Sequence, residues 1–219
     1  MKILITGTSK GIGKAVAERY LSLGHEVIGL DLLSSSITNN RYIHFKVDIS
    51  NKEELPEIDN VEVIFSNAGK QNDEDIKNNL IGTMNVIEKY AFNKSIKSIL
   101  INASASASTG QEFPEYVASK SALIGYMKNV AIRLAKYGAT VNSISLGGVL
   151  TESNKPVTDD PILWNKVMEV TPLKKWMSVE EVCDFVIFLT LTNKSMSGQD
   201  ILVDNGEKDL NPTFVWPTK

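Results

Sequence analysis

Residues 6–13 read Thr6-Gly7-Thr8-Ser9-Lys10-Gly11-Ile12-Gly13 and directly follow the apolar run Ile3-Leu4-Ile5. The apolar run predicts a buried strand, and the amphipathic segment after the glycines predicts a helix beginning at residue 11. Glycines at such a junction allow a tight turn and let the backbone approach a pyrophosphate at the helix N-terminus. Elsewhere these glycines would indicate only a structural turn, but between the first strand and the first helix they predict nucleotide binding.

The rest of the chain alternates short apolar runs with amphipathic segments, which is typical of βαβ units. We predict one α/β domain over residues 1–219: a Rossmann-type, doubly wound, mainly parallel sheet of about seven strands with helices on both faces. The expected strands are 2–6, 25–31, 42–47, 61–66, 97–103, 139–145 and 200–204. The expected helices are 11–23, 73–91, 114–137, 161–170 and 178–191.

Three connections between these elements are predicted to lack a full helix. Residues 32–41 are too few for one, and residues 48–61 hold a single helical turn that Pro56 stops. Residues 103–108 alternate alanine and serine directly after a strand and are interpreted as a loop.

Composition limits the possible classes of function. The 219 residues include 42% hydrophobic and 22% charged residues and carry a net charge of −3, without a basic cluster. Neither nucleic-acid binding nor a membrane-surface role is therefore expected. No apolar stretch approaches the roughly 20 residues of a membrane span, and we expect a cytoplasmic protein. Cys183, His25 and His44 form no ligand cluster, so no metal is expected.

The expected second strand ends at an acidic residue, Asp31. A carboxylate there suits the hydroxyls of an adenosine ribose and repels a 2′-phosphate. Leu32 follows, where an NADP-binding protein would carry a basic side chain. Lys10 points the other way, since a cation beside the glycine turn would attract a 2′-phosphate. We expect the repulsion by Asp31 to dominate, which favours NAD over NADP.

Tyr116 and Lys120 lie four residues apart within a predicted helix. Residues at this spacing share a helix face, so the phenol and the ammonium can converge on one ligand. The cation is expected to stabilise phenolate and to lower the tyrosine pKa from about 10 towards the working pH, as general acid–base catalysis requires. Taken alone, the pattern would more simply indicate an exposed Tyr/Lys pair.

In this order along nearly the whole chain, these motifs resemble the short-chain dehydrogenase/reductase family, in its non-extended, single-domain branch. The remaining matches are Asp48-Ile49, Asn67-Ala68-Gly69, an Asn-Leu-x-Gly motif from Asn79, a serine after a strand, Val141-Asn142-Ser143-Ile144 leading to Gly147 and Thr151, and Ser197-Gly198-Gln199 leading to Val203-Asp204-Asn205-Gly206. The resemblance implies reversible hydride transfer between a nicotinamide and a carbonyl or secondary alcohol of a small-molecule substrate.

The resemblance also implies a role for each matched residue. Tyr116 would be the acid–base, Lys120 would hold the nicotinamide ribose, and Asn79 would fix a water in a proton relay. A serine would orient the substrate oxygen, and Ser104 is preferred to Ser106 because it directly follows a strand. The cofactor contacts would be Gly7, Ser9, Lys10, Gly11, Ile12, Gly13, Asp31, Leu32, Asp48, Ile49, Asn67, Ala68, Gly69, Tyr116, Lys120, Gly147, Val149 and Thr151.

Three features depart from the family pattern. The spacing from Ser104 to Tyr116 is about one residue short, Leu146 replaces a usual proline, and Asn205 replaces a glycine. None of these changes removes a reacting group.

Two segments are expected to complete the molecule around this site. Residues 148–172 are predicted to form a substrate lid, although the lid candidates Leu163, Trp164 and Met168 also suit an ordinary amphipathic helix. Residues 207–219 are predicted to form a tail that places Phe214 and Trp216 at a subunit contact.

Apolar residues beyond one face of helices 73–91 and 114–137 predict a symmetric homo-oligomer, a tetramer or a dimer. They are Ile81, Met84, Ile87, Tyr90, Leu123, Tyr126, Met127, Val130 and Leu134. The same scaffold also suits two other functions: a non-catalytic dinucleotide sensor, and a nucleotide-sugar epimerase or dehydratase. The second would need an added substrate domain, for which 219 residues leave no room.

Overall fold

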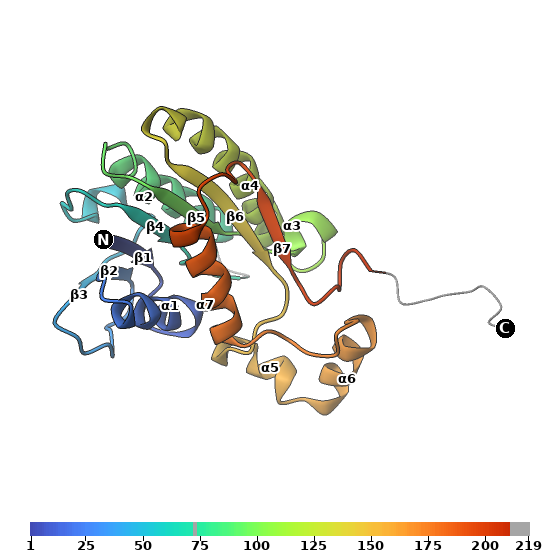
Figure 1. Cartoon of the computed structure of the whole chain (residues 1–219). Helices are drawn as coiled ribbons and strands as arrows, with labels where there is room; N and C mark the ends of the chain where they lie inside the picture. Colours follow the sequence, from blue (N-terminus) through green and yellow to red (C-terminus); the bar gives the residue numbers. More distant parts are fainter. Residues whose placement is uncertain (72–73, 211–219) are drawn as a thin grey trace.

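The computed structural model describes residues 1–71 and 74–210 (Figure 1). Within them, seven strands form one parallel sheet in the order β3-β2-β1-β4-β5-β6-β7. The strands are β1 (Lys2–Thr6), β2 (Glu26–Asp31), β3 (Tyr42–Lys46), β4 (Val63–Ser66), β5 (Ser98–Asn102), β6 (Thr140–Leu146) and β7 (Asp200–Val203). The predicted Rossmann-type fold is confirmed, with every strand within two residues of its predicted ends.

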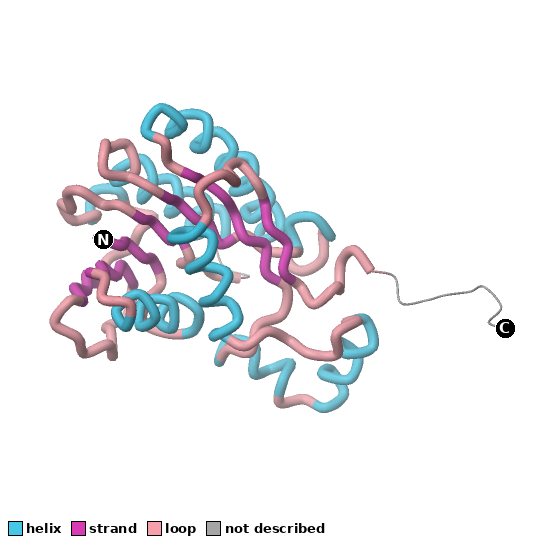
Figure 2. Tube along the Cα trace, viewed as in Figure 1, coloured by secondary structure: helices cyan, strands magenta, loops and turns pink. Residues whose placement is uncertain are grey.

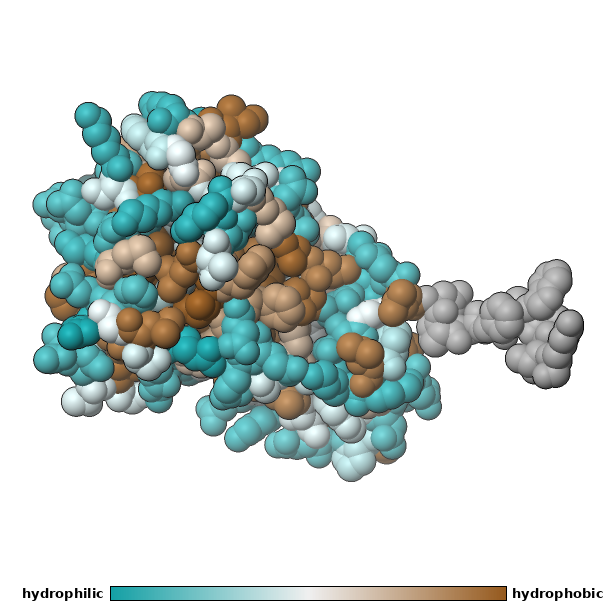
Figure 3. Space-filling view, viewed as in Figure 1, coloured by the Kyte–Doolittle hydropathy of each residue, from teal (hydrophilic) through white to brown (hydrophobic). Residues whose placement is uncertain are grey.

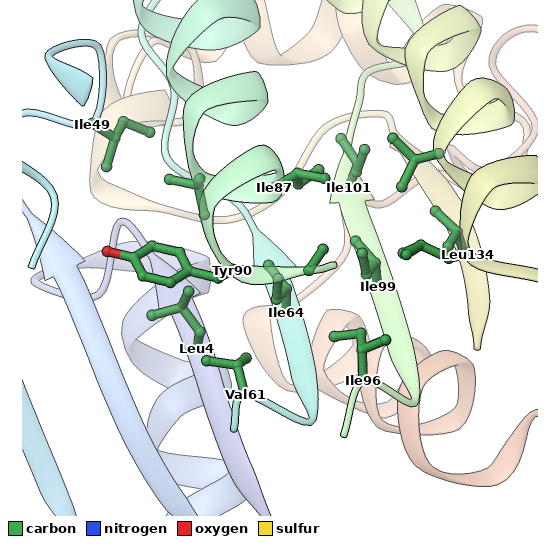
Figure 4. Close-up of a cluster of buried hydrophobic side chains, with 14 of the residues drawn as sticks. Leu4, Ile49, Val61, Ile64, Ile87, Tyr90, Ile96, Ile99, Ile101 and Leu134 are labelled. Atoms are coloured by element: carbon green, nitrogen blue, oxygen red, sulfur yellow. The ribbon is translucent and has the colours of Figure 1, made fainter. Parts of the chain in front are cut away.

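Helices cover both faces of the sheet because side chains along each strand alternate between the faces. Leu4 packs in the cluster under α2 (Gly82–Tyr90) and α4 (Pro114–Leu134). Its neighbours Ile3 and Ile5 pack under α1 (Gly11–Ser22) and α7 (Val179–Ile187). Figure 2 shows the two helical layers, and Figure 4 shows the first of these clusters. Burial of each such aliphatic side chain stabilises the folded state by about 1.5–3 kcal/mol relative to leaving it exposed.

The long helices contain departures from α-helical geometry that the sequence did not predict. The predicted helix 73–91 starts as the π-helical segment Ile76–Ile81 and continues as α2, while residues 72–73 lie outside the described residues. The end of the predicted helix 178–191 is a second π-helical segment, Phe188–Thr192. Such segments are frequent at functional sites, and Asn79 lies in the first of them.

The connections differ in part from expectation. Lys52–Glu54 form a single 3₁₀ turn before Pro56, as predicted. The interpretation of residues 103–108 as a loop is wrong at its end, because a short helix α3 (Ser106–Thr109) forms there and closes at Gly110, whose φ is +71°. Short helices have little periodicity, so sequence alone does not reveal them.

The predicted lid segment contains two helices, α5 (Lys155–Thr158) and α6 (Pro161–Val170). The Asp160 carboxylate caps α6 by accepting the N–H groups of Ile162 and Leu163. Figure 1 shows α5 and α6 set apart from the sheet, and no residue of α6 is buried. Helix α6 is therefore not an ordinary core helix of the domain.

The helix residues proposed to meet another subunit mostly pack within this chain. Ile87, Tyr90, Leu123, Met127, Val130 and Leu134 are all buried. Among the predicted nine, Ile81 alone is strongly exposed, at 41%. That part of the argument for an oligomer was wrong, because α2 and α4 bury wider apolar stripes than one sheet-facing row requires.

None of the helices in the described part of the chain combines the length and the apolar character that a membrane span requires.

Candidate active site

The glycine turn between β1 and α1 is shaped to leave room beside the backbone. Gly7 and Gly11 adopt φ values of +78° and +56°, where other residues are strained. A Cβ on Gly13 would lie 2.0 Å from the Gly7 carbonyl oxygen, so no other residue fits there. At Gly11, a Cβ would meet only the Thr151 methyl at 3.9 Å. This open space beside the start of α1 fits a dinucleotide phosphate.

A carboxylate lies directly beside this turn. Asp31 accepts the N–H of Ser9 at 2.9 Å and the N–H of Leu33 at 2.8 Å. Leu32 is 45% exposed, and Lys10 is exposed at the N-cap position of α1. The structure thus holds a negative charge against the glycine turn, while the cation of Lys10 extends towards solvent.

The segment Asn67–Gly69 is tied to the same turn. The Thr6 hydroxyl oxygen accepts the N–H groups of Asn67 and Ala68, both at 2.9 Å. The Asn67 amide donates to the Thr6 carbonyl at 3.2 Å and accepts from the Asn102 amide at 3.1 Å. The carboxyl ends of β1, β4 and β5 therefore form one connected edge, where ligands of open parallel sheets bind.

Asp48 and Ile49 lie on the turn after β3. Asp48 accepts the N–H of Ser50 at 2.9 Å. Ile49 is buried against Gly82, where a Cβ would lie 2.8 Å from the isoleucine side chain. These contacts explain how the turn is held in place. Contact of Asp48 and Ile49 with an adenine stays a prediction.

Tyr116 and Lys120 lie on α4, which starts with Pro114 at a position where proline favours helix formation. Lys120 is only 4% exposed, and its Nζ donates to the Asn102 carbonyl at 2.8 Å. The same Nζ lies 5.6 Å from the centre of the Tyr116 ring. The structure thus brings the phenol and the ammonium together beside the end of β5.

Burial changes the proton affinities of both groups. It raises the pKa of Tyr116 to about 12, although a hydrogen bond with Ser104 opposes the rise. It lowers the pKa of Lys120 to about 8, although the charges of Asp75 and Glu112 oppose the fall. The expected depression of the tyrosine pKa is therefore not found, because desolvation is the largest influence and the charges of Glu112 and Asp75 add to the rise.

Both candidate serines are buried at the carboxyl end of β5. The Ser106 hydroxyl donates to Ser104 Oγ at 2.9 Å, and the Ser106 N–H donates to the same oxygen at 3.2 Å. Ser104 also lies close enough to Tyr116 to lower the pKa of the phenol. Ser104 is thus the serine that acts on the phenol, and Ser106 holds it in place.

Asn79 is fully buried and joins two chain segments beside Lys120. Its Oδ1 accepts the Lys70 N–H at 2.7 Å, and its Nδ2 donates to the Lys70 carbonyl at 2.9 Å. Nδ2 also donates to Ser119 Oγ at 3.1 Å, and that hydroxyl donates to the Tyr116 carbonyl. Asn79 therefore positions the chain at Lys70 and the first turn of α4, and its link to a water stays a prediction.

A cavity of about 520 Å³ opens at this edge of the sheet. It gathers the predicted residues Ile12, Ser104, Tyr116, Gly147, Val149 and Thr151. It is also lined by residues that sequence reasoning did not select: Gln71, Asn102, Glu112, Val167, Val170, Trp176 and Glu207. These come from six separate segments and carry no common motif, so only the fold reveals them.

Trp176 forms part of the cavity wall. Its indole lies on Gly148, where a Cβ would be 2.0 Å from the ring, so the close approach requires glycine. Trp164 of α6 contacts the same indole edge to face, with 5.3 Å between ring centres. This pair attaches the predicted lid to the cavity.

Within the described residues, no three His, Cys, Asp or Glu side chains gather in a way that would hold a metal ion.

Comparison with known proteins places this arrangement in a family. A family model described as enoyl-(acyl carrier protein) reductase matches residues 61–208. The chain is 30% identical to a 3-oxoacyl-(acyl-carrier-protein) reductase of Buchnera aphidicola, covering 92% of this chain and 95% of the relative. It is 26% identical to a glucose 1-dehydrogenase of Gluconobacter oxydans, covering 94% and 91%.

Solved structures show the same architecture. A short-chain dehydrogenase family protein from Francisella tularensis is 26% identical with a TM-score of 0.82, covering 94% of this chain and 98% of that chain. ElxO, solved with NADP bound, is 21% identical with a TM-score of 0.83 and the same coverage.

The fold and the glycine turn define a dinucleotide-binding oxidoreductase. The chain belongs to the short-chain dehydrogenase/reductase family, and it is an NAD(P)-dependent enzyme that acts on alcohol or carbonyl groups. The non-catalytic sensor considered from the sequence is set aside.

Proposed function

We propose that this enzyme transfers hydride reversibly between NAD(H) and a carbonyl or secondary alcohol carbon, with Tyr116 as the general acid–base. One observation carries the proposal: Ser104, Tyr116 and Lys120 converge beside one cavity, with Lys120 Nζ held on the Asn102 carbonyl at 2.8 Å. A bound nicotinamide supplies or accepts the hydride. In reduction, the Tyr116 phenol donates its proton to the substrate oxygen, and its raised pKa keeps that proton available.

The neighbouring groups orient the reactants. The Ser104 hydroxyl, held by Ser106, orients the substrate oxygen towards Tyr116. The Lys120 ammonium holds the nicotinamide ribose, and Asn79 keeps Lys120 and Tyr116 in place through Lys70 and Ser119. Val149 and Thr151 line the same cavity, with the Thr151 methyl beside Gly11, and would contact the nicotinamide amide.

The cofactor is proposed to be NAD rather than NADP. Support comes from Asp31, whose carboxylate is fixed by two backbone N–H groups beside the glycine turn, where it would repel a 2′-phosphate. NADP in ElxO shows that proteins of this fold also bind the phosphorylated dinucleotide. NADH is expected to bind at least tenfold more tightly than NADPH, a difference in binding free energy of about 1.4 kcal/mol.

Isotope transfer tests the proposed reaction. NADH deuterated at C4 of the nicotinamide, incubated with a panel of ketones, should deliver deuterium to the carbinol carbon of the product. The parallel reaction with deuterated NADPH should be slower by the ratio of the two affinities. Product without deuterium at that carbon would contradict hydride transfer, and faster transfer from NADPH would contradict the role of Asp31.

Three further proposals concern the molecule around the site. The chain acts as a single domain, because the helices of both layers pack on one sheet. Residues 148–172 act as the substrate lid, since Val167 and Val170 of α6 line the cavity. The chain forms a symmetric homo-oligomer. The tail residues Phe214 and Trp216, predicted at a subunit contact, lie outside the described residues.

A further inference from the structure

Three acidic residues line the cavity: Glu112, Asp204 and Glu207. The Asp204 carboxylate accepts the backbone N–H groups of Gly206 and Lys208, while Glu112 and Glu207 have no assigned part in proton or hydride transfer. Glu112 precedes α4, and Glu207 follows β7, so the fold brings them together from distant parts of the sequence. Burial raises the pKa of Glu112, and the nearby charges also act on it: Lys120 opposes the rise and Glu207 adds to it. Both carboxylates therefore face the space where a substrate must approach Tyr116.

Each carboxylate is oriented by neighbouring donors. The Gln71 amide donates to Glu112 Oε2 at 2.7 Å. The buried Thr171 hydroxyl donates to Glu207 Oε1, and the Trp176 indole N–H donates to the same oxygen at 3.4 Å. An ionised carboxylate offers about four acceptor positions. Both groups thus keep acceptor capacity for donors within the cavity.

The other residues of the cavity wall indicate the rest of the substrate's chemistry. The Trp176 indole, fixed between Gly148 and Trp164, offers an aromatic surface on which aliphatic C–H groups pack. Lys208 also lines the cavity, but its ammonium pairs with Asp209 at 2.9 Å. The wall therefore combines hydrogen-bond acceptors with the aromatic surface of Trp176. The negative charge of its glutamates disfavours anionic substrates.

We infer that the substrate is a neutral polyhydroxylated compound, a sugar or polyol, whose hydroxyl groups donate to Glu112 and Glu207 while its carbon skeleton packs on Trp176. This inference rests on the proposed function and specifies its substrate class. In oxidation, one carbinol C–H gives its hydride to NAD⁺, the O–H proton passes to Tyr116 in its phenolate form, and a carbonyl remains. Phosphorylated, carboxylated and acyl-carrier substrates are disfavoured by the two carboxylates.

Steady-state oxidation of three alcohols tests the inference, with NAD⁺ reduction as the readout. Sorbitol and gluconate are both polyols, but gluconate carries a carboxylate, and cyclohexanol lacks the additional hydroxyls. We expect kcat/KM for sorbitol to exceed that for gluconate at least about tenfold, which is about 1.4 kcal/mol. Cyclohexanol should also be a poorer substrate than sorbitol.

Charge-neutral variants show whether the two residues cause this preference. Glu112→Gln and Glu207→Gln, singly and combined, should reduce the sorbitol-to-gluconate ratio roughly threefold or more. Glu26→Gln, an exposed site at the start of β2, is the matched control and should leave the ratio unchanged. NADH titration of each variant shows that the cofactor site is still folded.

The outcomes separate the two levels of the proposal. Gluconate or cyclohexanol oxidised as well as sorbitol, or a ratio that both Gln variants leave unchanged, would overturn the substrate class and leave the proposed oxidoreductase intact. Failure of every alcohol, and of the ketone panel in reverse, with either dinucleotide would overturn the proposed function itself.

Discussion

At the scale of single residues, desolvation shifts the pKa values of the two proposed catalytic groups. Tyr116 and Lys120 are both largely removed from water, and each is shifted towards its neutral form. A phenol that keeps its proton is suited to donate it during carbonyl reduction. An ammonium with a pKa of about 8 stays charged at neutral pH but loses its proton under mildly alkaline conditions.

The lowered pKa of Lys120 predicts a pH dependence of stability. Between pH 8 and about pH 9, Lys120 binds a proton in the unfolded chain, where its pKa is 10.5, but not in the folded protein. The free energy of unfolding should therefore rise with pH in this window, by at most about 1.4 kcal/mol per unit. Above it, the Cys183 thiol acts in the opposite direction, because burial raises its pKa to about 11.

Urea denaturation at several pH values measures this slope. Lys120→Met, which retains an unbranched side chain without the titrating group, should lack the rise. Equal slopes in the wild-type protein and the variant would show that Lys120 titrates alike in the folded and unfolded states.

The two serines should differ in importance for catalysis. Ser104→Ala removes the hydroxyl that acts on the pKa of Tyr116, and turnover should fall by roughly 10²-fold, as for loss of one oxyanion-type donor. Ser106→Ala removes only the hydrogen bond that the Ser106 hydroxyl donates to Ser104, and turnover should fall far less. Turnover and NADH affinity measured side by side decide the ranking, and a larger loss for Ser106→Ala would reverse the assignment.

Some residues of the site were predictable from sequence, and others were not. The glycine turn, Tyr116 and Lys120 have fixed spacings that local geometry explains. Glu112 and Glu207 have no such spacing, since the fold alone places them in one cavity. Asn205, which departs from the family pattern, adopts a φ of +58°, a conformation that asparagine tolerates better than most residues.

At the scale of elements, the glycine turn contributes both shape and stability. Gly13→Ala should abolish dinucleotide binding, because its Cβ would lie 2.0 Å from the Gly7 carbonyl and force the turn open. The strain should also lower the free energy of unfolding by roughly 1–3 kcal/mol. Gly125→Ala on the exposed side of α4 is the control, since its Cβ meets nothing within 4 Å.

The control should be stabilised by about 0.5–1 kcal/mol, because alanine favours the helix. Thermal unfolding and NADH titration of both variants test the pair. Normal cofactor affinity in Gly13→Ala would contradict the proposed phosphate site.

Element boundaries were predictable where the sequence carries explicit signals. Helix 161–170 matches α6 at both ends, because Asp160 caps it and Pro161 occupies its first position. The π-helical segments and α3 were missed, since an extra residue in a turn or a four-residue helix leaves the apolar pattern nearly unchanged.

At the scale of the whole molecule, the alternation of strands and helices was sufficient to predict the sheet and both helical layers. The cavity was not predictable, because its wall combines the turn at Gly7–Gly13, the start of α4, the lid segment and the chain after β7. The assembly surface predicted on the two helices was wrong, since most of its residues are buried within this chain.

A homo-oligomer remains our prediction, now because apolar residues are exposed on a different helix. Phe185 and Phe188 of the α7 region are 39% and 49% exposed. Figure 3 shows apolar residues gathered on the face that carries α7. Such patches favour self-association through a symmetric contact. Sedimentation at micromolar concentration should give a multiple of 24.1 kDa, and Phe185→Glu should shift the distribution towards smaller species. A wild-type protein that sediments only at 24.1 kDa would exclude the oligomer.

The central claim is that the Tyr116 phenol carries the transferred proton, and one substitution tests it most directly. Tyr116→Phe retains the ring and removes the hydroxyl, so turnover should fall roughly 10²- to 10⁴-fold while NADH affinity stays nearly unchanged. The measurement is the turnover number on the best substrate, with NADH titration on the same preparation. A variant that keeps more than roughly half of the wild-type turnover would contradict the account.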